Sequence, residues 1–202
     1  MGGLERFIVD LSNELARKGH EVVLVTIKDD AVHSDYRKFY CDEIAANVKY
    51  RNLGLPDGLS LKAEKAIYSV IREEMPDVVH MHLTNTPIFA LYVMMRLHNK
   101  VSFVETIHNS LVPSYNSRAR RLYFQNCGRW GWSKFVCLSE TNYKDMFTTY
   151  PYCSSTMVVN GRAPQTLSPH YDTVRKEMES MSSSADSLML LIILIVVGKP
   201  TF

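Results

Sequence analysis

Histidines lie at the ends of two apolar segments, at positions where strands of a sheet would end. His82 lies near the end of VVHMHL, and His108 directly follows VSFVETI. A neutral imidazole can donate and accept hydrogen bonds near pH 7, which suits contact with a hydroxyl group or a developing diphosphate charge. Open α/β sheets bind ligands at the carboxyl ends of their strands, so His108 is the first candidate for a catalytic residue. His82, Thr84 and Asn109 are candidates to line the same site; the alternative for His108 is a structural histidine.

A glycine pair, Gly2-Gly3, precedes an apolar pattern with helical spacing. Because glycine has no Cβ, a phosphate can approach the backbone N–H groups there, and the helix dipole favours its negative charge. A tight turn without a ligand is the alternative. Glu5 would lie in the first turn of this helix, where an acid is favourable with or without a substrate.

Several other classes of site and protein are disfavoured. His80 shares a strand face with His82 and is expected to lie deeper, but no acidic or cysteine third ligand is near, so we expect no metal site. The four cysteines are scattered without metal or disulfide spacing. A net charge of +2 argues against a nucleic-acid binder. The longest apolar run, 188–197, is far shorter than the ~20 residues of a membrane-spanning helix, which predicts a soluble protein.

Strand and helix patterns alternate along the first 161 residues, as in a doubly wound, mostly parallel α/β sheet. Gly19 stands where a helix C-cap glycine belongs, and VVLVT after it is apolar on both faces, like a strand covered by helices on each side. The predicted strands are 22–26, 48–53, 78–83, 101–107, 135–138 and 157–160. The predicted helices are 4–15, 61–75, 86–98, 117–127 and 140–147.

The amino-acid composition changes after Gly161. We interpret residues 162–187 as a linker with a short helix around 172–181, and residues 188–202 as the first strand of a truncated second domain. A βαβ unit also places a strand before its first helix, and this strand is missing, so both ends are expected to be cut. One alternative is that residues 188–197 dock into the gap that the first strand would fill.

Six short motifs, in order, resemble the N-terminal half of the retaining GT-B glycosyltransferases of the family 4 type. The first is Gly2-Gly3-Leu4-Glu5, followed by a helix that ends in Gly19-His20-Glu21-Val22. The others are Asp77–His82 (DVVHMH), Thr106–Asn109 (TIHN), Leu138-Ser139-Glu140, Val159-Asn160-Gly161 and Val197-Gly198-Lys199. The family has a proline where Val159 stands.

The resemblance implies a Rossmann-like, acceptor-side domain over residues 1–161 of an enzyme that moves a sugar from a nucleotide sugar to a glycan or lipid-linked acceptor, with retention. It implies a nucleotide-sugar co-substrate, no metal, a role in polysaccharide biosynthesis and a cytoplasmic location. In the family a histidine at the position of His108 approaches the sugar or the acceptor, and Ser139 and Glu140 are substrate-binding candidates by their motif. Because the donor-binding half is absent, we expect this chain alone to transfer no sugar. The alternatives are a non-catalytic remnant, a sugar- or lipid-acceptor binding module, and, less favoured, an epimerase.

A basic stretch with interleaved aromatic residues follows the TIHN motif. A solvated basic face over core aromatics is the favoured interpretation, and peripheral contact with an anionic inner membrane face is the alternative. Its residues are Arg118, Arg120, Arg121, Arg129 and Lys134, with Tyr123, Phe124, Trp130 and Trp132 between them.

Overall fold

A computed structural model of the chain describes residues 3–28, 40–55, 61–82, 88–108, 118–161 and 192–197. The predicted linker and its short helix lie outside these residues. The helices are α1 (Gly3–Arg17), α2 (Leu61–Glu74), α3 (Ile88–Leu97), α5 (Arg118–Trp130), α6 (Glu140–Thr149) and the short 3₁₀ turn η1 (Cys41–Glu43). The strands are β1 (Glu21–Lys28), β2 (Val48–Leu55), β3 (Val78–His82), β4 (Ser102–Ile107), β5 (Lys134–Cys137), β6 (Ser155–Met157) and β7 (Ile192–Val197).

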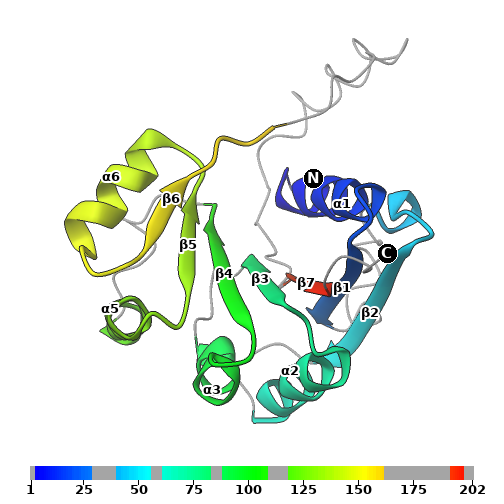
Figure 1. Cartoon of the computed structure of the whole chain (residues 1–202), viewed down its shortest axis with the longest axis horizontal. Coiled ribbons are helices and arrows are strands. Elements are labelled where there is room, and N and C mark those ends of the chain that lie inside the picture. Colours follow the sequence, from blue (N-terminus) through cyan, green and yellow to red (C-terminus); the bar gives the residue numbers. More distant parts are fainter. Residues whose placement is uncertain are drawn as a thin grey trace, which may run out of the picture.

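The strands form one sheet in the order β2-β1-β7-β3-β4-β5-β6 (Figure 1). The pairs β1–β2, β3–β4, β4–β5 and β5–β6 are parallel. Their carboxyl ends therefore share one edge, and His82 and His108 lie there. The prediction of an α/β, mostly parallel Rossmann-like sheet is confirmed.

Strand β7 lies inside the sheet between β1 and β3, and it runs antiparallel to both of these neighbours. Residues 192–197 pair with 21–26 of β1 and, through 192–196, with 78–82 of β3. In the doubly wound order this position belongs to the strand that precedes the first helix. The observed sheet therefore agrees with the alternative expectation, in which this segment occupies the place of the missing first strand. The division into domains 1–161, 162–187 and 188–202 stays a prediction.

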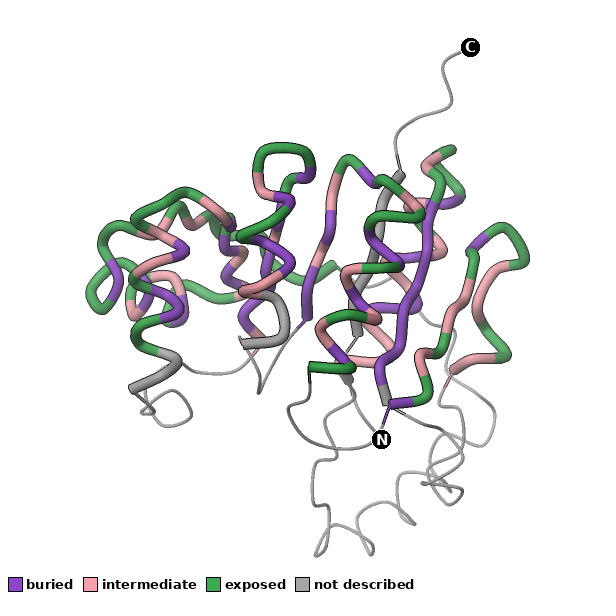
Figure 2. The backbone as a smooth tube through the Cα atoms, turned by 90° about the horizontal axis from the view of Figure 1, so that it is seen from below, coloured by how far each residue is buried: buried purple, intermediate pink, exposed green. Residues whose placement is uncertain are grey.

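Two apolar layers enclose the sheet. On one face α1 packs on β1 and β2 through a cluster that includes Ile8, Val22 and Leu24. On the other face a larger cluster draws on α2, α3, α5 and α6. Figure 1 shows α1 on the opposite side of the sheet from α2 and α3, and Figure 2 shows the buried residues gathered along the strands and the inner sides of helices. Successive residues of β1 are buried on alternate faces, as predicted for a strand covered on both sides.

Polar contacts fix α1 relative to the loop before β2. The Asn13 amide donates to the Glu43 carbonyl at 2.8 Å and accepts from the Ala45 N–H at 2.8 Å. Arg6 forms ion pairs with Asp10 and Glu43. Gly19 follows the helix with φ 86°, in the left-handed region that glycine tolerates best. These contacts set the direction of α1 and with it the position of its first turns.

The predicted elements agree with the structure to within two residues at their described ends, except for the helix predicted at 117–127, which is observed as α5 and ends at Trp130, and for the last strand of the parallel series. The expected strand was 157–160, whereas β6 spans Ser155–Met157 and pairs with Phe135 to Cys137 of β5. Val158 and Val159 are exposed and lie beyond the paired stretch. The apolar pattern failed here because this edge strand is short and mostly exposed, so burial does not mark its ends.

The interior position of β7 between β1 and β3 can be tested by hydrogen exchange. Because β7 pairs on both sides, we expect the amides of residues 192–197 to exchange as slowly as those of β1 and β3. The edge strand β6, paired on one side only, is the internal control and should exchange faster. Residue-resolved exchange at neutral pH measures this, and exchange of 192–197 at the rate of an unstructured peptide would contradict the sheet order.

Candidate functional site

Two histidines from adjacent strands meet at the carboxyl edge of the sheet. His82 is the last residue of β3, and His108 directly follows β4. The Nδ1 atom of His82 lies 3.0 Å from Nε2 of His108, within hydrogen-bond distance. His82 is fully buried and His108 is partly exposed. The two imidazoles therefore act as one unit, of which His108 is the part that reaches solvent.

A second pair lies two residues before the first along the same strands. His80 Nε2 lies 2.7 Å from the Thr106 hydroxyl. His80 and His82 are on one strand face, as the alternation of side chains predicts, and their ring centroids are 4.2 Å apart. His82 is nevertheless more buried than His80, contrary to the expected order of depth. The reason is that His82 is enclosed by rings from three elements.

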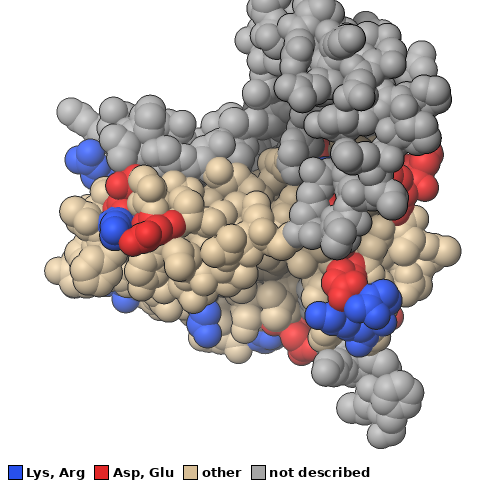
Figure 3. All heavy atoms as spheres, turned by 90° about the horizontal axis from the view of Figure 1, so that it is seen from above, with Lys and Arg blue, Asp and Glu red and all other residues tan. Residues whose placement is uncertain are grey.

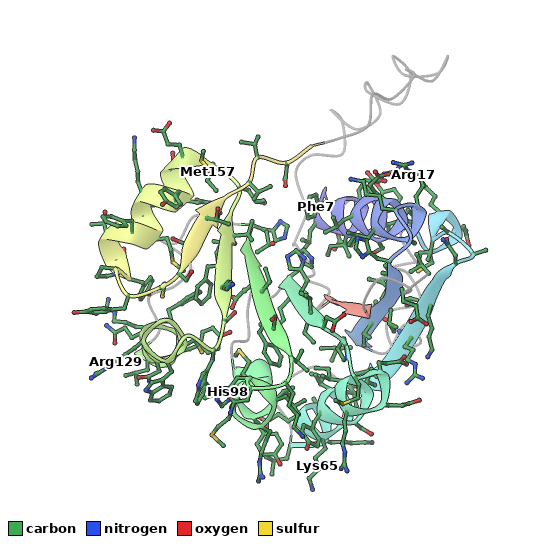
Figure 4. The ribbon with its side chains drawn as sticks, in the orientation of Figure 1. Phe7, Arg17, Lys65, His98, Arg129 and Met157 are labelled. Atoms are coloured by element: carbon green, nitrogen blue, oxygen red, sulfur yellow. The ribbon has the colours of Figure 1, made fainter. Side chains whose placement is uncertain are left out.

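The third of these elements is α1. The Phe7 ring meets His82 edge to face at 5.9 Å and His108 at 5.5 Å between centroids. Figure 4 shows Phe7 at the end of α1 nearest to the ends of β3 and β4, and Arg17 at the far end. The first turns of α1 thus contact the histidine pair directly.

Two polar side-chain atoms are buried and have no hydrogen-bond partner among the described residues: Oε2 of Glu5 and Nε2 of His82. Glu5 lies in the first turn of α1, as predicted. Most buried polar atoms in proteins are hydrogen-bonded, so an orphaned carboxylate oxygen is unusual. An oxygen of this kind could accept a hydrogen bond from a ligand hydroxyl group.

Burial keeps the three imidazoles neutral at physiological pH. It lowers the pKa of His108 to about 4. It also lowers the pKa of His80 to about 4, with a smaller contribution from His108. For His82, burial is again the main cause, and the pKa lies well below its usual 6.5. The cluster is therefore suited to hydrogen bonding by neutral rings rather than to attraction of anions by charge.

The structure brings only some of the predicted site residues together. His82, His108 and the helix that begins at Gly3 meet at one edge, whereas Gly2, Thr84 and Asn109 lie outside the described residues. Ser139 caps α6 by accepting the Asn142 N–H at 3.2 Å, and exposed Glu140 forms an ion pair with Lys144 at 2.7 Å. The contacts described for these last two residues stay within α6, and their substrate roles stay predictions.

Sequence reasoning did not assign Phe7 and Thr106 to the site. Phe7 was assigned to the apolar stripe of the first helix. The helical period predicts that this stripe is buried, but it does not predict that one of its residues contacts the ends of two strands. Thr106 was part of the TIHN motif, and its offset of two from His108 matches the offset of His80 from His82. That matched spacing was a usable signal for two side-chain pairs across adjacent strands.

The basic, aromatic stretch divides between core and surface. Tyr123 and Phe124 are buried in the core, whereas Trp130 is about half exposed and packs on Trp132 at 4.6 Å between centroids. On the face seen in Figure 3, acidic and basic side chains lie beside one another. Among the described residues, Glu14 and Arg17 of α1 form an ion pair. Contact with an anionic membrane stays a prediction.

Within the described residues, no three His, Cys, Asp or Glu side chains are grouped so that they could hold a metal ion. No helix in the same part of the chain is both long enough and apolar enough to cross a membrane.

The neutral histidine cluster predicts a loss of stability in mild acid. The folded pKa values lie below the unfolded value near 6.5, so below that pH the unfolded chain binds protons that the folded chain does not. Stability is fully present above pH 6.5 and falls toward pH 4, by up to roughly 1.4 kcal/mol per pH unit for each histidine. Urea unfolding between pH 7.5 and 5.5, above most carboxylate titration, measures this.

The variant His108→Gln removes one of these titrating groups, so its stability should depend less steeply on pH. Met81→Leu, a buried change on the neighbouring strand β3 without an ionisable group, is the matched control and should keep the wild-type slope. A wild-type stability that is constant across this pH range would contradict neutral burial of the cluster.

Comparison with known proteins is consistent with the motifs and the fold. The family model described as Glycosyltransferase Family 4 matches residues 1–162, which include α1 to α6 and β1 to β6. No curated protein matches the chain. The resemblance expected from the six motifs is thus confirmed over most of the sequence, and the chain belongs to glycosyltransferase family 4.

Proposed function

We propose that residues 1–162 form the acceptor-side domain of an enzyme that transfers a sugar from a nucleotide sugar to a glycan or a lipid-linked acceptor. The observation that carries this proposal is the histidine pair at the carboxyl edge of the sheet, in a chain that belongs to a glycosyltransferase family. Open α/β folds place ligands at this edge. Partial exposure of His108 leaves it accessible, while His82 and Phe7 hold its ring in place.

The proposed reaction proceeds with retention at the anomeric carbon. The bond from this carbon to the diphosphate oxygen breaks, a bond to the acceptor oxygen forms on the same face, and the proton of the acceptor hydroxyl passes to the leaving diphosphate. Negative charge grows on the diphosphate, so fixed hydrogen-bond donors contribute most of the catalysis. The start of α1 is suited to this role, because its first N–H groups have no partners within the helix and its dipole favours an anion.

We assign direct substrate contact to His108 and to Glu5. A neutral imidazole can hydrogen-bond a sugar hydroxyl, and the orphaned Oε2 of Glu5 can accept a hydrogen bond from one. Gly2, Gly3, Thr84 and Asn109 complete the proposed ligand-binding set by their positions in the sequence. The proposed reaction uses a nucleotide-sugar co-substrate and no metal ion.

Ligand binding at His108 is the direct test of this proposal. Histidine ring resonances are followed by NMR during titration with UDP-glucose, GDP-mannose, methyl α-glucoside and methyl α-mannoside. We expect at least one of these probes to shift the His108 resonances, and we expect His108→Ala to weaken its binding by 10-fold or more. The reason is that a buried or half-buried hydrogen bond to a polar ligand contributes roughly 1–3 kcal/mol.

Met81→Leu serves as the control again, because it alters β3 on the face away from the histidines and should leave the affinity within about twofold. If none of the probes shifts the His108 resonances, the proposed site is wrong. Release of nucleoside diphosphate in the presence of an acceptor would contradict the expectation that this chain alone transfers no sugar.

A further inference from the structure

The hydrogen bond between His82 and His108 links the protonation of the two rings. It joins Nδ1 of His82 to Nε2 of His108 at 3.0 Å. Both rings are neutral, and in a neutral imidazole one nitrogen carries a proton while the other is a bare acceptor. Of the two nitrogens that face each other, one must donate and the other must accept. The tautomer of His82 therefore determines the tautomer of His108.

The surroundings of His82 distinguish the two arrangements. If His82 accepted at Nδ1, its proton would be on Nε2, which is buried without a partner among the described residues. A buried N–H without an acceptor is costly, about 1–3 kcal/mol, and orphaned buried N–H groups are rarer than orphaned acceptors. If His82 donates from Nδ1, only a lone pair is left unmatched at Nε2. The second arrangement is the more favourable one.

The rings that pack around His82 prevent its imidazole from flipping. His80 lies against its face, with 4.2 Å between centroids, and His80 is itself held by Thr106 at 2.7 Å. Phe7 covers another side at 5.9 Å. A flip of the His82 ring would exchange the positions of its nitrogens and carbons and would break the 3.0 Å contact with His108.

We propose that His82 is a positioning residue that donates from Nδ1 to Nε2 of His108 and so holds His108 as its Nδ1–H tautomer. Nε2 of His108 is then occupied, and Nδ1–H is the donor that its ring keeps for other partners. His108 therefore works as a neutral hydrogen-bond donor to an oxygen atom, and not as a proton acceptor. The choice of a sugar or diphosphate oxygen as that partner rests on the proposed function; the tautomer itself does not.

The test reads the tautomers directly. Long-range ¹H–¹⁵N correlation spectra of the full chain with ¹⁵N-labelled histidine, at pH 7.5, distinguish protonated from bare ring nitrogens, and single His→Gln variants assign the signals. We expect bare Nε2 and protonated Nδ1 for both His82 and His108. A protonated Nε2 on His108 in the wild-type protein overturns the proposal without any variant.

Two variants separate positioning from a general structural effect. His82→Asn places an amide N–H near the former Nδ1, so His108 should keep the Nδ1–H tautomer. His82→Leu fills the space without a donor, so the Nε2–H form of His108 should appear. Backbone amide spectra establish that each variant is folded. If the His108 tautomer in folded His82→Leu is the same as in the wild type, His82 does not set it, and the proposal fails.

Ligand affinity tests the functional consequence of the tautomer, independently of the tautomer itself. With whichever probe shifts His108 in the titrations above, His82→Asn should stay within about threefold of the wild-type affinity and His82→Leu should lose 10-fold or more. Equal affinity of both variants overturns the functional consequence of the tautomer. If the tautomers are as expected and no probe binds, the proposed function fails while the role of His82 stands.

Discussion

Backbone pairing of β7 with both β1 and β3 makes the sheet continuous. Among the described residues, β1 and β2 form one parallel pair, β3 to β6 form a parallel group, and β7 is the strand that hydrogen-bonds to both. Helix α1 packs on the first pair, whereas His82 and His108 belong to the group on the other side of β7. The contact of Phe7 with these histidines therefore joins elements from the two sides of β7. The distance between Phe7 and the histidines depends on the spacing between β1 and β3, which β7 sets by pairing with both.

The site itself combines burial with neutrality. Three imidazoles and a phenyl ring pack together at the carboxyl edge of the sheet. Neutral rings cost less to bury than cations, and each still offers directional hydrogen bonds. The carboxylate of Glu5 is the acidic group in the neighbouring first turn of α1. In the proposed chemistry, the neutral imidazoles supply hydrogen-bond donors and acceptors near the sheet edge. The backbone N–H groups at the start of α1 stabilise the anion.

Much of the fold could be predicted because its signals are local. The apolar periods, Gly19 and the helix caps depend on neighbouring residues, and they place α1, β1 and α2 within a residue or two of their observed bounds. The position of residues 192–197 could only be left as an alternative, because an apolar segment gives no information on which strands it pairs with or in which direction. Likewise, the sequence places His82 at a strand end but cannot reveal that Phe7 and His80 enclose it.

An antiparallel strand in the middle of a parallel sheet has a consequence for how the molecule is made. Its partners in β1 and β3 emerge from the ribosome long before residues 192–197 do, so both remain as bare edges during synthesis. Unpaired edges of this kind are templates for association with other chains, and pairings between distant parts of a sequence form slowly. The nascent chain is thus a natural client for chaperones until β7 has been translated.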